Sequence, residues 1–122
     1  MSPDPLISIV DDDDSLRVAM VGLVRSLGYR ASGHPTAEAF LASGEVAAAS
    51  CVITDLQMPG MGGIGLKRAL DAGDVHVPVI MITARTESVL LESARESGAL
   101  CLLRKPVETD ALIDCINRAL AA

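Results

Sequence analysis

Four short apolar runs and one weaker candidate strand at residues 29–33, separated by segments in which apolar residues recur at helical spacing, dominate the pattern of this sequence. The runs are nearly continuous and do not alternate between polar and apolar residues, which is typical of strands buried on both faces. Strands that alternate with helices predict a parallel sheet covered by helices on both sides, and right-handed crossovers make it an open, doubly wound α/β layer. The expected strands cover residues 6–10, 29–33, 51–55, 77–83 and 100–103.

Capping and turn residues mark where the intervening helices begin and end. Gly28 is expected to close the first helix and Gly98 the fourth, because glycine readily adopts the left-handed conformation that ends many helices. Thr36 and Thr109 are expected to cap the second and fifth helices, and Thr86 to open the fourth. The expected helices begin near residues 16, 36, 64, 86 and 109.

Length and composition favour a single soluble domain. Residues 1–122 contain no internal repeat or linker and are long enough to bury a core. Half of the residues are apolar and only Tyr29 and Phe40 are aromatic, so the core should be aliphatic. No apolar run approaches the roughly 20 residues of a membrane span. Residues 1–5 lack the basic start and apolar stretch of a signal peptide.

Charge and cysteine content indicate which partners and which cellular compartment suit this domain. A net charge of −6 argues against a nucleic-acid-binding surface on this domain, although it says nothing about a neighbouring domain. Three cysteines, an odd number without a C-x-x-C pair, favour the reducing cytoplasm. All three of them (Cys51, Cys101 and Cys115) are interpreted as small, buried apolar residues.

Polar and charged residues follow four of the five predicted strands. The first strand delivers Asp11 and Asp12, the third Asp55, the fourth Thr83 and the fifth Lys105. Because the carboxyl ends of parallel strands lie at one edge of the sheet, these side chains should converge. Three crowded carboxylates repel one another unless a cation neutralises them. Mg²⁺ suits the group because it binds a few carboxylates and keeps waters that a phosphate can replace; no histidine or cysteine pattern indicates zinc.

The acidic run 11–14 also has a simpler interpretation. Carboxylates stabilise the positive N-terminal end of a helix, and this role accounts for Asp13 and Asp14. Asp11 and Asp12 are still at the edge of the strand, so we assign them to the metal site.

Each remaining residue has an ordinary interpretation when it is considered alone. Asp55 could be a loop carboxylate, Thr83 a common strand former and Lys105 a solvated surface charge. Pro106 favours a role for Lys105 in a site, because a cis peptide bond before this proline would direct the lysine side chain. Together, five such residues at consistent strand ends favour a site.

A glycine-rich segment at residues 60–65 matches the G-x-G-x-x-G pattern of dinucleotide-binding proteins. That pattern requires glycine immediately after the strand, whereas residues 55–59 intervene here, and the nearby carboxylates would repel a pyrophosphate. The acidic residue near the required spacing, Glu87, falls in a predicted helix. We therefore expect these glycines to supply loop freedom beside Asp55.

These residues make the chain resemble the receiver domain of bacterial two-component response regulators over essentially its whole length. The matching segments are residues 9–13, 55–59 with Gly63 beyond, Thr83-Ala84 and Lys105-Pro106. Residues 35–41 further resemble the FixJ-type branch of that family. The resemblance implies a CheY-like, flavodoxin-like sheet of five strands in the order 2-1-3-4-5, with five helices.

The resemblance also implies the role of each acidic residue. Asp55 would accept a phosphoryl group from the phosphohistidine of a sensor histidine kinase or of a phosphotransfer protein. Asp12 and Asp55 would bind Mg²⁺ together with the backbone carbonyl of Gln57, and Asp11 would act largely through water. The only enzymatic activity expected is Mg²⁺-dependent self-phosphorylation and slow hydrolysis of the phosphoryl group.

The remaining site residues would sense the phosphoryl group. By the same resemblance, Thr83 and the amide of Ala84 would contact its oxygens and Lys105 would form an ion pair with it. A hydrogen bond that draws Thr83 toward the phosphoryl group would repack the face made by the fourth helix, fifth strand and fifth helix. That face would control an output domain or partner and could form a homodimer after phosphorylation.

Three positions depart from the family pattern, all of them near the lysine. Leu102 stands where the family commonly has a rotating Tyr or Phe, Val107 replaces the usual Phe, and Arg104 replaces a common acidic residue. A leucine lacks the area of an aromatic ring, so it cannot reproduce the same inward-outward switch. We expect phosphorylation chemistry to be intact and signalling to use Thr83 and backbone shifts.

Two other functions compete with this prediction. A phosphorylation-independent interaction module with the same fold would explain Leu102 and Val107, but it leaves the acidic cluster unexplained. A Mg²⁺-dependent phosphohydrolase would need another acid or base near Asp55, and Gln57 and Arg85 are poor candidates.

Overall fold

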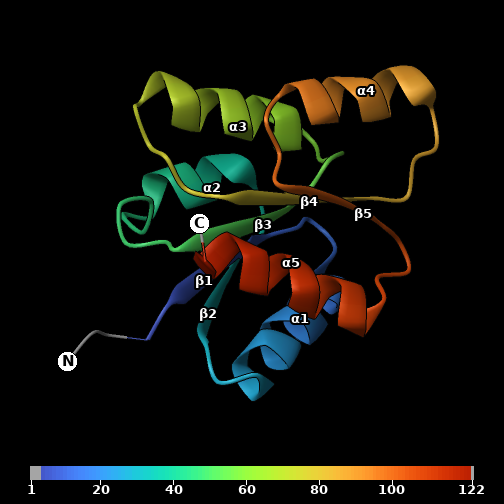
Figure 1. The fold of residues 1–122 in the computed structure, drawn as a ribbon. Helices are drawn as coiled ribbons and strands as arrows, with labels where there is room; N and C mark the ends of the chain where they lie inside the picture. The colour runs from blue at the N-terminus through green and yellow to red at the C-terminus, as the bar shows by residue number, and fades with distance from the viewer. Residues whose placement is uncertain (1–3, 122) are drawn as a thin grey trace.

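The computed structural model describes residues 4–121 as a five-stranded parallel sheet with helices on both faces (Figure 1). The strands are β1 (Leu6–Val10), β2 (Arg30–His34), β3 (Cys51–Asp55), β4 (Val79–Thr83) and β5 (Cys101–Arg104). The helices are α1 (Asp14–Ser26), α2 (Ala37–Ala42), α3 (Gly63–Ala72), α4 (Ser88–Glu96) and α5 (Thr109–Ala121). All pairings are parallel and the strand order is β2-β1-β3-β4-β5, which confirms the predicted architecture.

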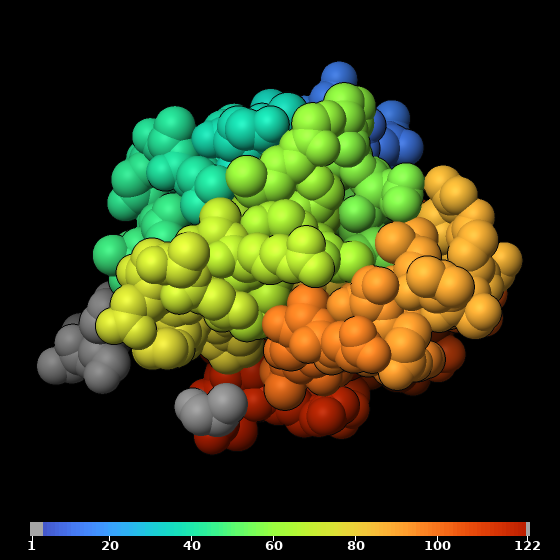
Figure 2. Space-filling view, turned by 90° about the horizontal axis from the view of Figure 1, so that it is seen from above, coloured from blue at the N-terminus to red at the C-terminus, as the bar shows by residue number. Residues whose placement is uncertain are grey.

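The helices divide between the two faces of the sheet. Helices α1 and α5 cover one face, and α2, α3 and α4 cover the other, the face seen from above in Figure 2. Alternate strand residues pack into the two cores: in β4, Ile80 and Ile82 contact the α1–α5 side, and Val79 and Met81 contact the opposite side. This double burial explains why β1, β3 and β4 have nearly continuous apolar sequences.

Three element starts differ by two residues from the sequence-based expectation: α1 begins at Asp14, β4 at Val79 and α4 at Ser88. Helix α4 has Glu87 at its N-cap, so the expectation that Thr86 opens it is wrong. The N–H of Arg85 donates to the Thr83 hydroxyl, and the Arg85 side chain pairs with Glu87. These contacts favour a loop before α4, and they leave no trace in the periodicity of apolar residues.

The cysteines correct a second expectation. Cys51 is a free thiol that is fully buried in β3, as expected. Cys101 and Cys115 are also buried, as expected, but they form a disulfide between β5 and α5, so their interpretation as simple apolar residues was incomplete. Fourteen positions separate them in the sequence, and they meet only because the chain after β5 reverses direction and α5 packs back on the sheet.

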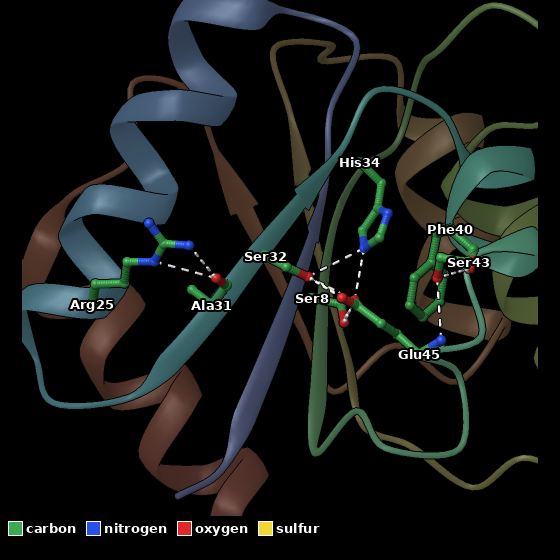
Figure 3. Close-up of polar contacts among 8 residues, drawn as sticks. All are labelled: Ser8, Arg25, Ala31, Ser32, His34, Phe40, Ser43 and Glu45. Atoms are coloured by element: carbon green, nitrogen blue, oxygen red, sulfur yellow. Dashed lines mark hydrogen bonds and ion pairs between the residues drawn. The ribbon is translucent and has the colours of Figure 1, made fainter.

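A polar network beneath α2 joins the loop before β3 to the edge of the sheet (Figure 3). Glu45 accepts hydrogen bonds from Ser8 at 3.2 Å and from Ser32 at 2.6 Å, and it lies 2.7 Å from His34 Nε2. The His34 ring also meets the Phe40 ring edge-on, with centroids 5.3 Å apart. The network therefore satisfies the buried Ser8 and His34 side chains.

Replacing Glu45 should make stability depend less on pH. Burial raises the pKa of the Glu45 carboxyl, but hydrogen bonds from Ser32, His34 and Ser8 outweigh burial and lower it overall. Ionised Glu45 thus stabilises the fold above its unfolded-state pKa, and this contribution is lost as the pH falls through the lowered folded-state value. Glu45→Gln should be less stable than the parent at pH 7, with the difference shrinking in acid.

Urea unfolding across a pH series measures this effect, and Glu96→Gln, which alters an exposed carboxylate on α4, is the matched control. A Glu45→Gln deficit that stays constant or grows on acidification would contradict the assignment.

Candidate functional site

Four charged side chains meet at the carboxyl edge of the sheet. Asp11 directly follows β1, Asp55 ends β3 and Lys105 directly follows β5. Lys105 Nζ lies 2.7 Å from Asp55 Oδ2 and 3.7 Å from Asp11 Oδ2. Asp12 joins them, since one carboxylate oxygen each from Asp11, Asp12 and Asp55 lies within 4.8 Å of the others. The structure therefore brings these four predicted residues together.

For both Asp11 and Lys105, burial and a neighbouring opposite charge shift the pKa in opposite directions. Asp11 and Asp55 are buried, whereas Asp12 is exposed. Burial raises the pKa of Asp11 above its ordinary value, although the Asp13 N–H and the charge of Lys105 oppose the rise. Burial lowers the pKa of Lys105, but its hydrogen bond to Asp55 and the two carboxylate charges outweigh this and raise it overall. Lys105 is therefore a stable cation at neutral pH.

Backbone N–H groups orient the two buried carboxylates. Asp11 Oδ1 accepts from the N–H of Asp13 at 2.9 Å, and Asp55 Oδ1 accepts from the N–H of Gln57 at 3.0 Å. Each contact closes a turn with the residue two positions further on. One oxygen of Asp55 is thus held by its own chain while the other faces Lys105, which fixes the direction of the carboxylate.

The first residues of α1 contact the segment after β1 that carries Asp11 and Asp12. Asp13 is the N-cap and accepts from the N–H of Leu16 at 3.0 Å, and Asp14 lies in the first turn, which confirms the capping prediction for both. Arg17 pairs with Asp14 and also donates to the backbone carbonyl of Asp11 at 2.9 Å. Sequence analysis missed Arg17, because no residue pattern encodes a contact with a backbone carbonyl.

Thr83 and Ala84 lie on the adjacent strand and the loop that follows it. Asp55 pairs with Ile82 in the β3–β4 register, so Thr83 lies one residue further along β4. Thr83 is fully buried, and Ala84 is exposed. Arg85 donates to the side-chain oxygen of Gln57 at 3.3 Å, and this contact links the loops that follow β3 and β4.

The glycine-rich segment packs against the backbone around Asp55. A Cβ atom on Gly62 would lie 2.7 Å from the carbonyl oxygen of Leu56, and one on Gly63 would lie 2.8 Å from that of Asp55. Gly60 has a φ of 76°, and the carboxylate of Glu38 accepts from the N–H of Met61 beside it. The glycines allow this close turn, so the rejection of a dinucleotide site agrees with the geometry.

The chain belongs to the response regulator receiver domain family, whose profile matches residues 7–117. It is therefore a receiver domain, the phosphoacceptor module of two-component signal transduction, and this family is not one of catalytic enzymes. The predicted resemblance is thus confirmed.

Relatives of the FixJ type are among the most similar. The chain is 33% identical over 114 residues to the transcriptional regulatory protein FixJ of Azorhizobium caulinodans, covering 93% of this chain and 54% of that protein. It is 33% identical over 116 residues to FixJ of Rhizobium meliloti, covering 95% and 57%. The chain thus spans about half the length of these curated relatives.

Solved structures agree with the fold. The response regulator StyR is 34% identical with a TM-score of 0.89, over 98% of this chain and 60% of that one. FixJ-N is 32% identical with a TM-score of 0.88, over 98% and 96%. The chemotaxis protein CheY4 of Vibrio cholerae, at 24% identity and a TM-score of 0.87 over 97% and 100%, shares the fold. Among residues 4–121, the helices are all too short or too polar to cross a membrane.

Proposed function

We propose that residues 1–122 act as one cytoplasmic receiver domain in which Asp55 accepts a phosphoryl group from the phosphohistidine of a sensor histidine kinase or of a phosphotransfer protein. The observation that carries this proposal is the buried Asp55 carboxylate, hydrogen-bonded to Lys105 at 2.7 Å beside two further carboxylates. An oxygen of Asp55 attacks phosphorus, and the imidazole nitrogen of the donor leaves with the bonding electron pair.

The donor set at this edge fits Mg²⁺. Three carboxylates offer hard oxygen ligands within 4.8 Å of one another, and exposed Asp12 leaves room for water. Asp12, Asp55 and the backbone carbonyl of Gln57 would hold the ion, with Asp11 acting largely through water. When bound, Mg²⁺ would neutralise negative charge on the phosphoryl oxygens.

Three other residues hold the phosphoryl group in this proposal. Lys105 is already directed at Asp55 and stays protonated, so it offers a positive charge to the new oxygens. The Thr83 hydroxyl accepts a hydrogen bond from the N–H of Arg85. In the phosphorylated protein, it also donates a hydrogen bond to a phosphoryl oxygen. The amide of Ala84, in the exposed loop after β4, donates a second hydrogen bond.

The signal then passes to the face formed by α4, β5 and α5. An aspartyl phosphate carries about −1.5 to −2 charge, where the free carboxylate carries a single negative charge. Thr83 moves toward the phosphoryl group and pulls on the loop before α4. Half-buried Leu102 occupies the position in β5 where the family commonly has an aromatic switch residue. Because leucine cannot act as that switch, backbone shifts transmit the conformational change. An unchanged loop before α4 in a crystal structure with a phosphoryl mimic would contradict this mechanism.

The same face suits a phosphorylation-dependent homodimer or an output domain. Val89 on α4 is 80% exposed, so its apolar side chain is available to a partner at this face. Relatives named as transcriptional regulators are about twice as long as this chain, which supports control of an output domain or a partner. A phosphorylation-independent interaction module is not favoured, because the acidic cluster and its lysine are intact.

Removing Mg²⁺ should slow phosphorylation on the order of 10²-fold, because uncompensated carboxylates then face an anionic donor. The measurement is the mass added during incubation with acetyl phosphate, with Mg²⁺ or with a chelator.

Asp12→Asn should need more Mg²⁺ for the same rate, and Asp110→Asn, on the exposed surface of α5, should behave as the parent. Phosphoryl uptake that proceeds equally with chelator would refute the metal assignment, and no uptake under any condition would refute the function.

A further inference from the structure

The disulfide between Cys101 and Cys115 joins two elements of the proposed signalling face. Their Cα atoms are 6.2 Å apart, within the usual range for disulfides. The bond connects the start of β5 to the middle of α5, and the segment between them carries Lys105. In the oxidised state, this segment is therefore anchored at both ends.

A surface cleft of about 370 Å³ reaches both cysteines. They are 8% and 5% exposed, and the cleft is also lined by Arg95 and Arg118. Arg118 Nη1 donates to the sulfur of Cys101 at 3.5 Å. Guanidinium groups stabilise thiolates and attract anionic thiols, so this cleft has the features of a site for thiol exchange.

The third cysteine offers an internal contrast. Cys51 is fully buried in the core, and burial raises the pKa of its thiol to about 12. It therefore stays protonated and unreactive. Only the pair beside the arginines combines proximity, access and positive charge.

We propose that Cys101 and Cys115 form a reversible thiol–disulfide switch, opened and closed by a small anionic thiol such as glutathione, which sets how far phosphorylation rearranges β5 and α5. The part that concerns phosphorylation rests on the function proposed above. Disulfides in a reducing cytoplasm are usually transient and redox-sensing, which favours a switch over a permanent cross-link.

The exchange balances with a thiol–disulfide couple as co-reactant. A glutathione thiolate attacks one protein sulfur, the S–S bond breaks, and the released cysteine takes up a proton. A second glutathione thiolate attacks the mixed disulfide, which yields the second cysteine thiol and oxidised glutathione. Two glutathione thiols are oxidised for each protein disulfide reduced, and oxidised glutathione drives the reverse reaction.

The first experiment tests the chemistry without phosphorylation. The full chain is equilibrated with glutathione at graded redox ratios, quenched in acid, alkylated and weighed. Cys101 and Cys115 should pass together between a disulfide and two alkylated thiols, while Cys51 stays unmodified in the folded protein. Oxidation should also slow, by about a hundredfold, the exchange of amides that open only on global unfolding, because the bond closes a loop of about 15 residues. A pair that stays reduced even in oxidised glutathione would overturn the proposal.

The second experiment tests the coupling. Hydrogen exchange in β5 and α5 is compared with and without a beryllium fluoride mimic of aspartyl phosphate, in the oxidised and the reduced protein. The change caused by the mimic should be several-fold smaller in the oxidised protein, and Cys101→Ser with Cys115→Ser should respond as the reduced form does. Cys51→Ala is the control that keeps the redox effect. An equal response in both redox states would overturn the switch, whereas failure of the proposed function would appear separately, as no mass gain from acetyl phosphate.

Discussion

Asp55→Asn should abolish phosphoryl uptake from acetyl phosphate with Mg²⁺. The amide oxygen of asparagine is a weak nucleophile and carries no charge, so both the attacking group and one proposed metal ligand are lost. Intact mass spectrometry should show one added phosphoryl group on the parent and none on the variant. The difference should be complete, because Asp55 is the carboxylate of the cluster that accepts a hydrogen bond from Lys105, whereas Asp11 lies 3.7 Å from it.

The variant should remain folded, since asparagine has nearly the same shape as aspartate and its side-chain oxygen can still accept the N–H of Gln57. Circular dichroism checks this, and Asp114→Asn, on the exposed surface of α5, should take up phosphate as the parent does. Phosphoryl mass that persists on Asp55→Asn would place the acceptor elsewhere and refute the main proposal.

Phe40→Ala should have the largest effect on stability. Phe40 is the only phenylalanine of the chain, is fully buried between α2 and the sheet, and meets the ring of His34. Its truncation leaves a cavity and removes apolar contacts, at a cost of about 3–5 kcal/mol. Because domains of this size are stable by only about 5–15 kcal/mol, this loss should remove a large share of the free energy of unfolding.

Urea unfolding at pH 7 measures the loss of free energy of unfolding. Leu41→Ala is a matched control, since Leu41 is next in α2 and joins the same core but is only partly buried. Leu41→Ala should lose clearly less free energy of unfolding than Phe40→Ala. Equal losses in the two variants would show that burial of the ring does not dominate the stability of this region.

The fold was predictable because local patterns and topology agree. β1, β3 and β4 are buried on both faces, so each appears as an uninterrupted apolar run that few other structures can accommodate. Right-handed connections restrict the possible orders, and the resemblance to receiver domains supplied the order 2-1-3-4-5. The start of α4 was predicted two residues too early, since the contacts of Arg85 with Thr83 and Glu87 in the preceding loop leave no mark in the apolar periodicity.

The site was predictable for a related reason. Parallel strands place their carboxyl ends together, so the residues that follow each strand indicate a common site before any coordinates exist. The structure brings Asp11, Asp12, Asp55 and Lys105 together, and their chemical roles remain predictions. Arg17, which supports Asp11 from α1, was missed because its contact is to a backbone carbonyl and no residue pattern encodes it.

By itself, the sequence determined the class of fold and the edge of the sheet that holds the acidic residues, because hydrophobic periodicity and strand ends are local properties. It gave the strand order only through its resemblance to receiver domains. Tertiary structure alone decided the pairing of Cys101 with Cys115 and the network of Glu45 with His34. Those contacts join residues 11 to 14 positions apart across different elements. Their distances depend on how the helices and loops pack on the sheet, which is a property of the whole chain.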